Sequence, residues 1–189
     1  LSQTLRDVDA LLESYEFARA CESIYHFAWD DLCDWYLELS KQTLASGDAA
    51  ATQRVLGHVL DTLFRLLHPV MPFITETLWT TLTGGKTLVT AQWPSADDSH
   101  VNKKSEALVG EIQKIITEVR RFRNDQGVKP SQKIPGRFIA PADVTQYESS
   151  MAFLLKLELT EFTPSASVEI GSMKVELDLS GTVDVAAER

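Results

Sequence analysis

Four carboxylates follow one another at short spacing early in the chain, at Asp30, Asp31, Asp34 and Glu38. On a helix, Asp30, Asp34 and Glu38 would share one face, because residues four apart lie on neighbouring turns. Such a cluster could bind a metal ion or serve as a general acid and base. It also has the spacing of a solvated acidic face, or of one that pairs with Arg or Lys elsewhere in the fold, and this is the interpretation we favour.

Other enzyme motifs are missing from the sequence. It contains no glycine-rich phosphate loop and no G-x-S-x-G nucleophile motif. The histidines at positions 26, 58, 68 and 100 are scattered, and none completes the E-x-x-H pair typical of dimetal helical bundles. We therefore predict no catalytic residue, no metal ligand and no cofactor site in this chain.

A local basic stretch interrupts an acidic chain. The net charge is −9, which argues against a protein that binds duplex nucleic acid through bulk electrostatics. Residues 120–137 nevertheless carry six basic side chains against Asp125 alone. These are Arg120, Arg121, Arg123, Lys129, Lys133 and Arg137. They could contact phosphates, or they could form a solvated helix end that complements its own helix dipole.

Composition indicates a folded protein without a membrane span. Apolar residues make up 44% of the chain, and no apolar run approaches the length of a transmembrane helix. Cys21 and Cys33 form no C-x-x-C pair, so we expect two reduced, buried thiols in a cytoplasmic protein. The chain starts at Leu1 without a secretory leader, and we interpret it as a piece of a longer protein.

The first half of the sequence has helical periodicity. Leu5, Val8, Leu12 and Tyr15 form one apolar stripe, and a second stripe with a different phase runs from Phe17 to Leu39. The slip predicts a helix break near Tyr15–Phe17, although neither Pro nor Gly marks it. We expect the second helix to end near Leu44, with Gly47 as its terminator and Asp48 as the next N-cap.

Proline and glycine delimit the following helices. A third helix carries a wide apolar face from Val55 to Leu67 and should end before Pro69, with His68 capping its end. Pro72 can open the next helix, which Gly84 and Gly85 should stop. A further amphipathic helix, with apolar residues from Leu108 to Phe122, should end at Gly127.

The pattern changes after Pro130. Residues 137–140 are a predicted strand, and residues 144–154 a helix. Residues 168–170 and 173–179 alternate around Gly171-Ser172, which predicts a β-hairpin on a two-residue turn. The expected fold is mainly α: an antiparallel helical bundle over residues 1–128, followed by a small α+β unit over residues 129–189.

Two stretches resemble valyl-tRNA synthetases, a family of class I aminoacyl-tRNA synthetases. Residues 25–41, YHFAWDDLCDWYLELSK, resemble the family segment F-x-W-x-x-F-C-D-W-Y-L-E-x-x-K, with Leu32 where Phe is common. Residues 66–79, LLHPVMPFITETLW, resemble a turn that the isoleucyl, leucyl and methionyl enzymes share. The resemblance covers roughly residues 1–137, and the C-D-W-Y-L-E run favours the valyl family.

The resemblance implies a class I anticodon-binding bundle, followed in the full-length enzyme by a C-terminal coiled coil. The catalytic signatures H-I-G-H and K-M-S-K-S are absent, as is an editing domain. The chain by itself would thus lack a catalytic site, whereas its full-length parent would use ATP and Mg²⁺ to charge tRNA(Val). The implied partners are the tRNA(Val) anticodon stem-loop and the parent's own catalytic, editing and coiled-coil domains, and we expect a monomer.

An acidic domain can bind an anticodon loop if it offers aromatic or arginine planes to unstacked bases. We expect Trp29, Trp35 and Tyr36 to pack in the core instead. The better candidates are Tyr15, Phe17 and Arg19, where the helical stripe slips, unless both aromatic rings are buried. Phosphate contacts are assigned to five residues of the basic stretch: Arg120, Arg121, Arg123, Lys129 and Lys133.

Three other functions compete with this hypothesis. The chain could be the anticodon-binding domain of an isoleucyl or leucyl enzyme, which the C-D-W-Y-L-E run disfavours. It could be a helical protein-interaction module that exposes an apolar groove and is indifferent to RNA. It could finally be a bundle enzyme that uses the acidic cluster.

Overall fold

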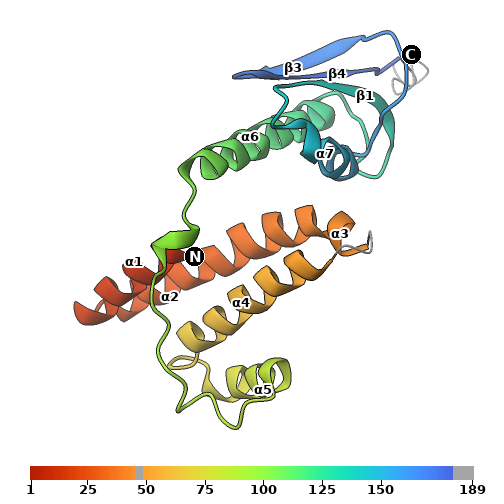
Figure 1. Ribbon diagram of the computed structural model, residues 1–189. Coiled ribbons are helices and arrows are strands. Elements are labelled where there is room, and N and C mark those ends of the chain that lie inside the picture. Colours follow the sequence, from red (N-terminus) through yellow and green to blue (C-terminus); the bar gives the residue numbers. More distant parts are fainter. Residues whose placement is uncertain (46–48, 181–189) are drawn as a thin grey trace. The chain divides into compact units, whose positions relative to one another are not determined.

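The computed structural model describes residues 1–45 and 49–180, and the chain divides into two compact units (Figure 1). The first unit is Leu1–Val101, and the second begins at Asn102. The helical pattern had suggested a boundary at residue 128. The boundary lies earlier in the sequence because α6 (Lys103–Asp125) belongs to the second unit, where it packs on β3 (Ala166–Ile170), β4 (Met173–Leu177) and α7 (Glu148–Leu155). A mainly helical chain with a small α+β unit at its C-terminal side is confirmed.

The first unit consists of helices. In order, these are α1 (Ser2–Glu13), α2 (Phe17–His26), the π-helix η1 (Phe27–Leu37), α3 (Glu38–Ala45), α4 (Ala50–Leu67) and α5 (Pro72–Thr83). Helix α1 packs on α2, α4 packs on α2, α3 and α5, and the ribbon shows these contacts side by side (Figure 1). The core is apolar and formed by Leu5, Val8, Ala20, Ile24, Phe27, Leu32, Leu63 and Leu66. The predicted terminator Gly47 and N-cap Asp48 lie outside the described residues.

The predicted break between the first two helices is confirmed, and it is a Schellman motif. Glu16 N donates to Leu11 O at 2.8 Å and Tyr15 N donates to Leu12 O at 3.1 Å. The same motif ends α6, where Val128 N donates to Arg123 O at 2.9 Å and Gly127 N to Asn124 O at 3.0 Å. The residue with positive φ is Gly127 in the second motif but Tyr15 in the first.

A π-helix replaces the α-helix expected over residues 27–37. Its hydrogen bonds reach five residues back, so each turn holds more residues than an α-helical turn. Buried positions accordingly recur at a spacing of five, at Phe27 and Leu32. Trp29 is 56% exposed and Cys33 is exposed, although we had expected both to be buried; Trp35 and Tyr36 are half-buried.

The turn between α4 and α5 follows from its prolines and a threonine. Helix α4 ends at Leu67, and Pro72 is the first residue of α5, as predicted. The Thr75 hydroxyl donates to Met71 O at 2.8 Å, and its oxygen lies 2.9 Å from His68 Nδ1. Because the Thr75 proton is used, His68 donates this bond. We had expected His68 to cap the end of α4, but its side chain instead binds the start of α5.

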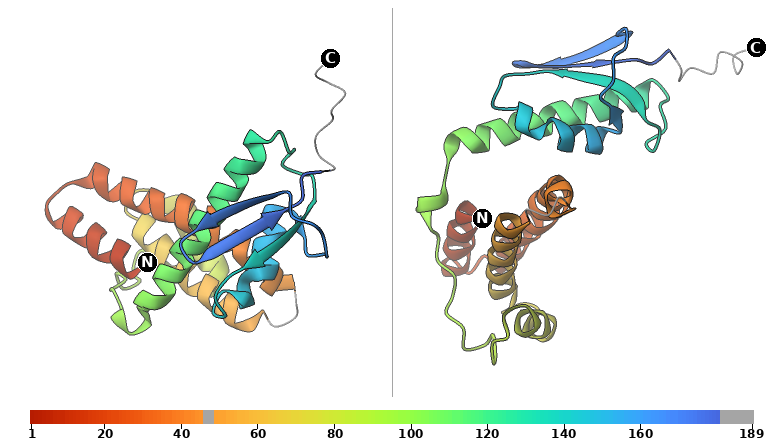
Figure 2. Two further views of the ribbon diagram at one scale, coloured as in Figure 1. Left: turned by 90° about the horizontal axis from the view of Figure 1, so that it is seen from above. Right: turned by 45° about the vertical axis from the view of Figure 1, so that its right-hand side comes forward.

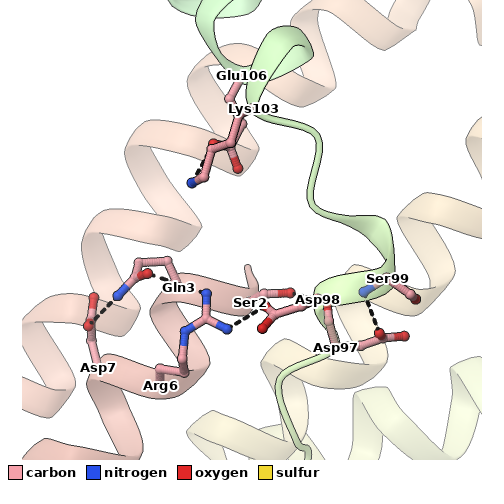
Figure 3. A network of polar contacts seen from close by, with 9 residues as sticks. All are labelled: Ser2, Gln3, Arg6, Asp7, Asp97, Asp98, Ser99, Lys103 and Glu106. Carbon is pink, nitrogen blue, oxygen red and sulfur yellow. Dashed lines mark hydrogen bonds and ion pairs between the residues drawn. The ribbon is translucent and has the colours of Figure 1, made fainter.

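The segment after α5 returns to α1. Gly84, with a φ of 68°, ends α5, and Trp93 Nε1 donates to Asp9 Oδ1 at 2.8 Å. Figure 3 shows Arg6 of α1 paired with Asp98 at 2.5 Å. The Ser2 hydroxyl donates to the Asp97 carbonyl oxygen at 2.8 Å. These contacts fix the end of the first unit to its first helix.

The second unit is a four-stranded mixed sheet with α6 and α7 (Glu148–Leu155) on one face (Figure 2). The strands are β1 (Ile134–Ile139), β2 (Leu157–Glu158), β3 (Ala166–Ile170) and β4 (Met173–Leu177), in the order β2-β1-β4-β3. Strands β1 and β2 are parallel, and the other pairs are antiparallel. Ile170 pairs with Met173, so the predicted hairpin on Gly171-Ser172 is confirmed.

Side chains alternate along β4. Met173, Val175 and Leu177 are buried, whereas Lys174 and Glu176 point to the other face. There Glu176 pairs with Arg137, and Lys174 lies 3.2 Å from Glu169. The hydrogen bond from Arg137 lowers the pKa of the Glu176 carboxyl, so this face is held by charged pairs. Within the described part of the chain, no helix is both long and apolar enough to cross a membrane.

Candidate functional site

Tyr15 combines backbone strain with an exposed ring. Its φ of 60° lies in the left-handed region, which costs an L-residue with a Cβ roughly 1–2 kcal/mol. The side chain is 80% exposed, so burial offsets little of this cost. Strained residues of this kind concentrate at functional sites, where the conformation itself is used. The turn between α1 and α2 therefore presents an aromatic ring to solvent at the expense of stability.

Phe17 lies beside this ring, and Arg19 follows two residues later on α2. The Tyr15 and Phe17 rings meet edge to face, with centroids 6.2 Å apart, and Phe17 is 57% exposed. Arg19 is exposed and pairs with Glu16 at 2.5 Å, three residues earlier. The structure thus brings together Tyr15 and Phe17, two of the three residues that the break in the helical stripe had singled out, and neither aromatic ring is buried.

Two further exposed rings lie later in the same helical segment, and sequence reasoning missed both. Tyr25 and Trp29 stack with an interplanar angle of 4° and centroids 6.3 Å apart. They are 57% and 56% exposed. Phe17 precedes Tyr25 by eight residues, which is ~12 Å along a helix axis. The signal in the sequence was the pair of aromatic residues four apart, but we had expected Trp29 to pack in the core.

The side chains around these rings are mostly acidic. His26 Nδ1 lies 2.8 Å from Asp30 Oδ2, and its Nε2 lies 4.0 Å from Glu22 Oε1. Glu16 uses its carboxylate on Arg19. Such a surface offers flat apolar faces without a basic field, which suits the stacking of bases better than the capture of phosphates.

Basic side chains gather in the second unit, from the last turns of α6 to the loop before β1. Arg120, Arg121, Lys129 and Lys133 are exposed. Arg121 lies 3.9 Å from Glu118 and 4.0 Å from Asp125, and Lys133 lies 3.9 Å from Glu158. These are long, solvent-exposed ion pairs, which contribute little to stability and exchange readily for other anions.

Arg123 does not belong to this exposed set, contrary to the expectation from sequence. It is 4% exposed, and its Nη2 donates to Gln132 O at 2.6 Å. Its Nη1 has no hydrogen-bond partner among the described residues, and burial lowers the pKa of the guanidinium. Arg123 faces inward because it lies four residues after Val119 on the buried stripe of α6. It ties α6 to the following loop.

The acidic cluster of the π-helix is not a metal site in the described residues. Asp30, Asp31 and Asp34 are exposed, and no group of three or more His, Cys, Asp or Glu side chains in the described ranges has the geometry for a metal ion. Glu38 pairs with Lys41 at 2.5 Å. A hollow of about 320 Å³ in the second unit is lined by Arg137, Glu148 and residues 159–161 among others, and by none of the predicted site residues.

Comparison with known proteins identifies a family. The model of the anticodon-binding domain of tRNA ligases matches residues 1–138. The valine–tRNA ligase of Corynebacterium glutamicum is 51% identical over 205 aligned residues, which cover 100% of this chain and 23% of that enzyme. Those of Streptomyces coelicolor and Mycobacterium tuberculosis are 47% and 48% identical, and each matches the whole chain with 22% of its own length. The chain thus spans less than a quarter of these relatives.

Proposed function

The chain belongs to the family of anticodon-binding domains of tRNA ligases, and we propose that it binds the anticodon stem-loop of tRNA(Val) within a full-length valine–tRNA ligase. In such a ligase the remaining three-quarters of the polypeptide would bind ATP and Mg²⁺ and catalyse aminoacylation. The ligase would act in the cytoplasm. The relatives matched over the whole chain are valine–tRNA ligases, which supports tRNA(Val) over the isoleucine and leucine tRNAs.

We assign base stacking to the aromatic surface formed by Tyr15, Phe17, Tyr25 and Trp29, with Arg19 beside it. The observation that carries this assignment is Tyr15, whose ring is 80% exposed on a strained backbone. Unpaired bases stack on aromatic rings regardless of the charge around them, because every base has a flat face. An acidic unit can therefore hold an anticodon loop without a basic groove.

We assign phosphate contacts to Arg120, Arg121, Lys129 and Lys133 of the second unit. All four side chains are exposed, and the ion pairs of Arg121 and Lys133 are long enough to exchange a carboxylate for a phosphate oxygen. Phosphate contacts release counterions, so they make affinity dependent on salt, whereas stacking contacts do not. The two assignments can thus be separated in one titration series.

The decisive experiment measures the affinity of the chain, and of the full-length ligase, for a tRNA(Val) anticodon hairpin. Tyr15→Ala, Phe17→Ala and Trp29→Ala should each weaken binding by about 5–150-fold, with the salt dependence unchanged, if each ring stacks on one base. Val55→Ala is the matched control, because Val55 is exposed on α4 and belongs to neither assigned set. Unchanged affinity in all three aromatic variants would refute the stacking surface.

The same titration tests the choice of tRNA. A tRNA(Ile) anticodon hairpin should bind more weakly than the tRNA(Val) hairpin to the unmodified chain. Equal binding of both hairpins would assign the chain to an RNA-binding role without valine specificity. Absence of binding to either hairpin would favour a protein-interaction module instead.

A further inference from the structure

Helix α5 has an apolar outer surface without a single charge. Glu76 is its only charged residue, and the Glu76 carboxylate accepts a hydrogen bond from Leu88 N at 2.9 Å. At 100° per residue, a sector of about 180° around the helix is covered by six exposed residues: Phe73, Ile74, Thr77, Leu78, Thr81 and Leu82. We define the α5 apolar face as Phe73, Ile74, Leu78 and Leu82 with the preceding Val70 and Met71. Phe73 is 89% exposed, and the other five are between 43% and 57% exposed.

The threonines of α5 make this surface less polar still. Each of the five turns its hydroxyl onto the carbonyl oxygen four residues earlier: Thr75 to Met71, Thr77 to Phe73, Thr80 to Glu76, Thr81 to Thr77 and Thr83 to Trp79. The distances are 2.7–3.1 Å. A hydroxyl that donates to its own helix leaves mainly its methyl group for the surroundings. A helix that is apolar on all sides is typical of a buried position.

The opposite side of α5 is already used by the first unit. Thr75 is 1% exposed, and Trp79 is 8% exposed with its indole N–H 2.6 Å from Asp61 Oδ1. Helix α5 therefore packs on the first unit with its opposite side, and the α5 apolar face is not needed for the core of that unit. It is a second surface, and the described residues of the first unit leave it uncovered.

We propose that the α5 apolar face is the docking surface for the remainder of the full-length ligase, in the same polypeptide. This inference rests on the proposed function, because it takes the chain as part of such a ligase. The relatives contain more than three-quarters of their length beyond the matched region. A contact within one polypeptide benefits from a high effective concentration, on the order of millimolar for short linkers.

The size of the face favours this occupant over a second copy of the chain. A half-cylinder of α5, ~18 Å long and ~10 Å wide, covers about 300 Å². A stable complex of separate proteins buries roughly 800 Å² on each partner. Contacts between domains of one chain start at about 600 Å² in total, which is twice the area of the face.

Hydroxyl-radical footprinting of the full-length ligase without tRNA tests the proposal. The oxidation rates of Phe73 and Tyr15 are compared after each is divided by its rate in the urea-unfolded protein. The two rings are similarly exposed in this chain, at 89% and 80%. Protection of Phe73 by at least about tenfold relative to Tyr15 is the expected result. Equal normalised rates would overturn the proposal. They would leave the tRNA assignment untouched, because that assignment is read from hairpin affinity.

Footprinting of the 189-residue chain by itself tells whether the α5 apolar face binds the remainder of the ligase or a second copy of the chain. Its Phe73 should oxidise at a rate that is independent of protein concentration. Protection that grows with concentration, together with dimers in sedimentation, would assign the face to a second copy and overturn the proposal. As a variant test, Leu78→Asp should leave the thermal midpoint of the chain unchanged and lower that of the full-length ligase, whereas Val55→Asp, which is equally exposed on α4, should lower neither.

Discussion

The indole N–H of Trp79 donates to Asp61 Oδ1 at 2.6 Å, across the contact between α5 and α4. Arg65 donates to the same carboxylate from Nε at 3.2 Å, and its Nη1 reaches Gln92 O at 2.8 Å. The Arg65 guanidinium also lies over the Trp79 ring, 5.8 Å from its centroid. Asp61 thereby joins two helices and the segment that follows them.

Asp61→Ala should lower the free energy of unfolding by about 1–3 kcal/mol, because it leaves the buried Trp79 N–H without an acceptor. Asp61→Asn retains an acceptor oxygen and should lose less. Urea unfolding followed by Trp fluorescence measures both. Equal losses in the two variants would show that charge, and not the acceptor, holds this contact.

Tyr15→Gly should raise the free energy of unfolding by about 1 kcal/mol, since glycine adopts positive φ without the cost that Tyr15 bears. The same change should weaken hairpin binding, because it removes a stacking ring. Lys156 also has positive φ, at 52°, and Lys156→Gly is the matched control for backbone relief without loss of a proposed contact. A Tyr15→Gly variant that gains stability and keeps full affinity would contradict the proposed role of the ring.

Removing basic residues should reveal which of them contact phosphates. Arg120→Gln and Lys129→Gln should each reduce the slope of log affinity against log salt by about 0.7–0.9. Lys103→Gln removes an equal charge ~25 Å away at the other end of α6 and should leave the slope unchanged. If all three variants change the slope alike, general charge and not local contact sets the affinity.

Arg123→Met should leave hairpin affinity and salt dependence unchanged, because the guanidinium is buried. Its effect on stability should stay within about 1 kcal/mol, since loss of the hydrogen bond to Gln132 O is offset by removal of a desolvated charge. The hairpin affinity of the folded Arg123→Met variant tests whether Arg123 contacts RNA. A large loss of binding would return Arg123 to the set of RNA contacts.

The loop after α5 should loosen in acid. The Thr87 hydroxyl and the Leu88 backbone N–H donate to the Glu76 carboxylate and lower the pKa of that carboxyl. A depressed folded-state pKa contributes stability above the ordinary glutamate value, about 4.3, and that contribution is lost as pH falls through the folded-state value. Glu76→Gln should flatten the pH dependence of the urea midpoint in this range. An identical pH profile in wild type and variant would exclude Glu76 as its source.

Local sequence alone located the elements whose ends depend on one residue. Pro72 at the start of α5, Gly127 after α6 and the Gly171-Ser172 hairpin follow from backbone chemistry that needs no neighbours. The phase slip likewise revealed the break at Tyr15, because two buried stripes cannot continue on one straight helix. The motifs around Trp35 and His68 resembled a family, and the structure gives them packing and turn-forming roles.

Tertiary structure decided which face of each helix meets solvent. We had expected Trp29 in the core, but it lies on the π-helix, 56% exposed, and stacks on Tyr25. Arg123 and Arg120 are indistinguishable by type and differ only in which side of α6 meets the sheet. The unit boundary moved from residue 128 to Val101 for the same reason. Burial is a property of the partner surface, which periodicity within one segment does not contain.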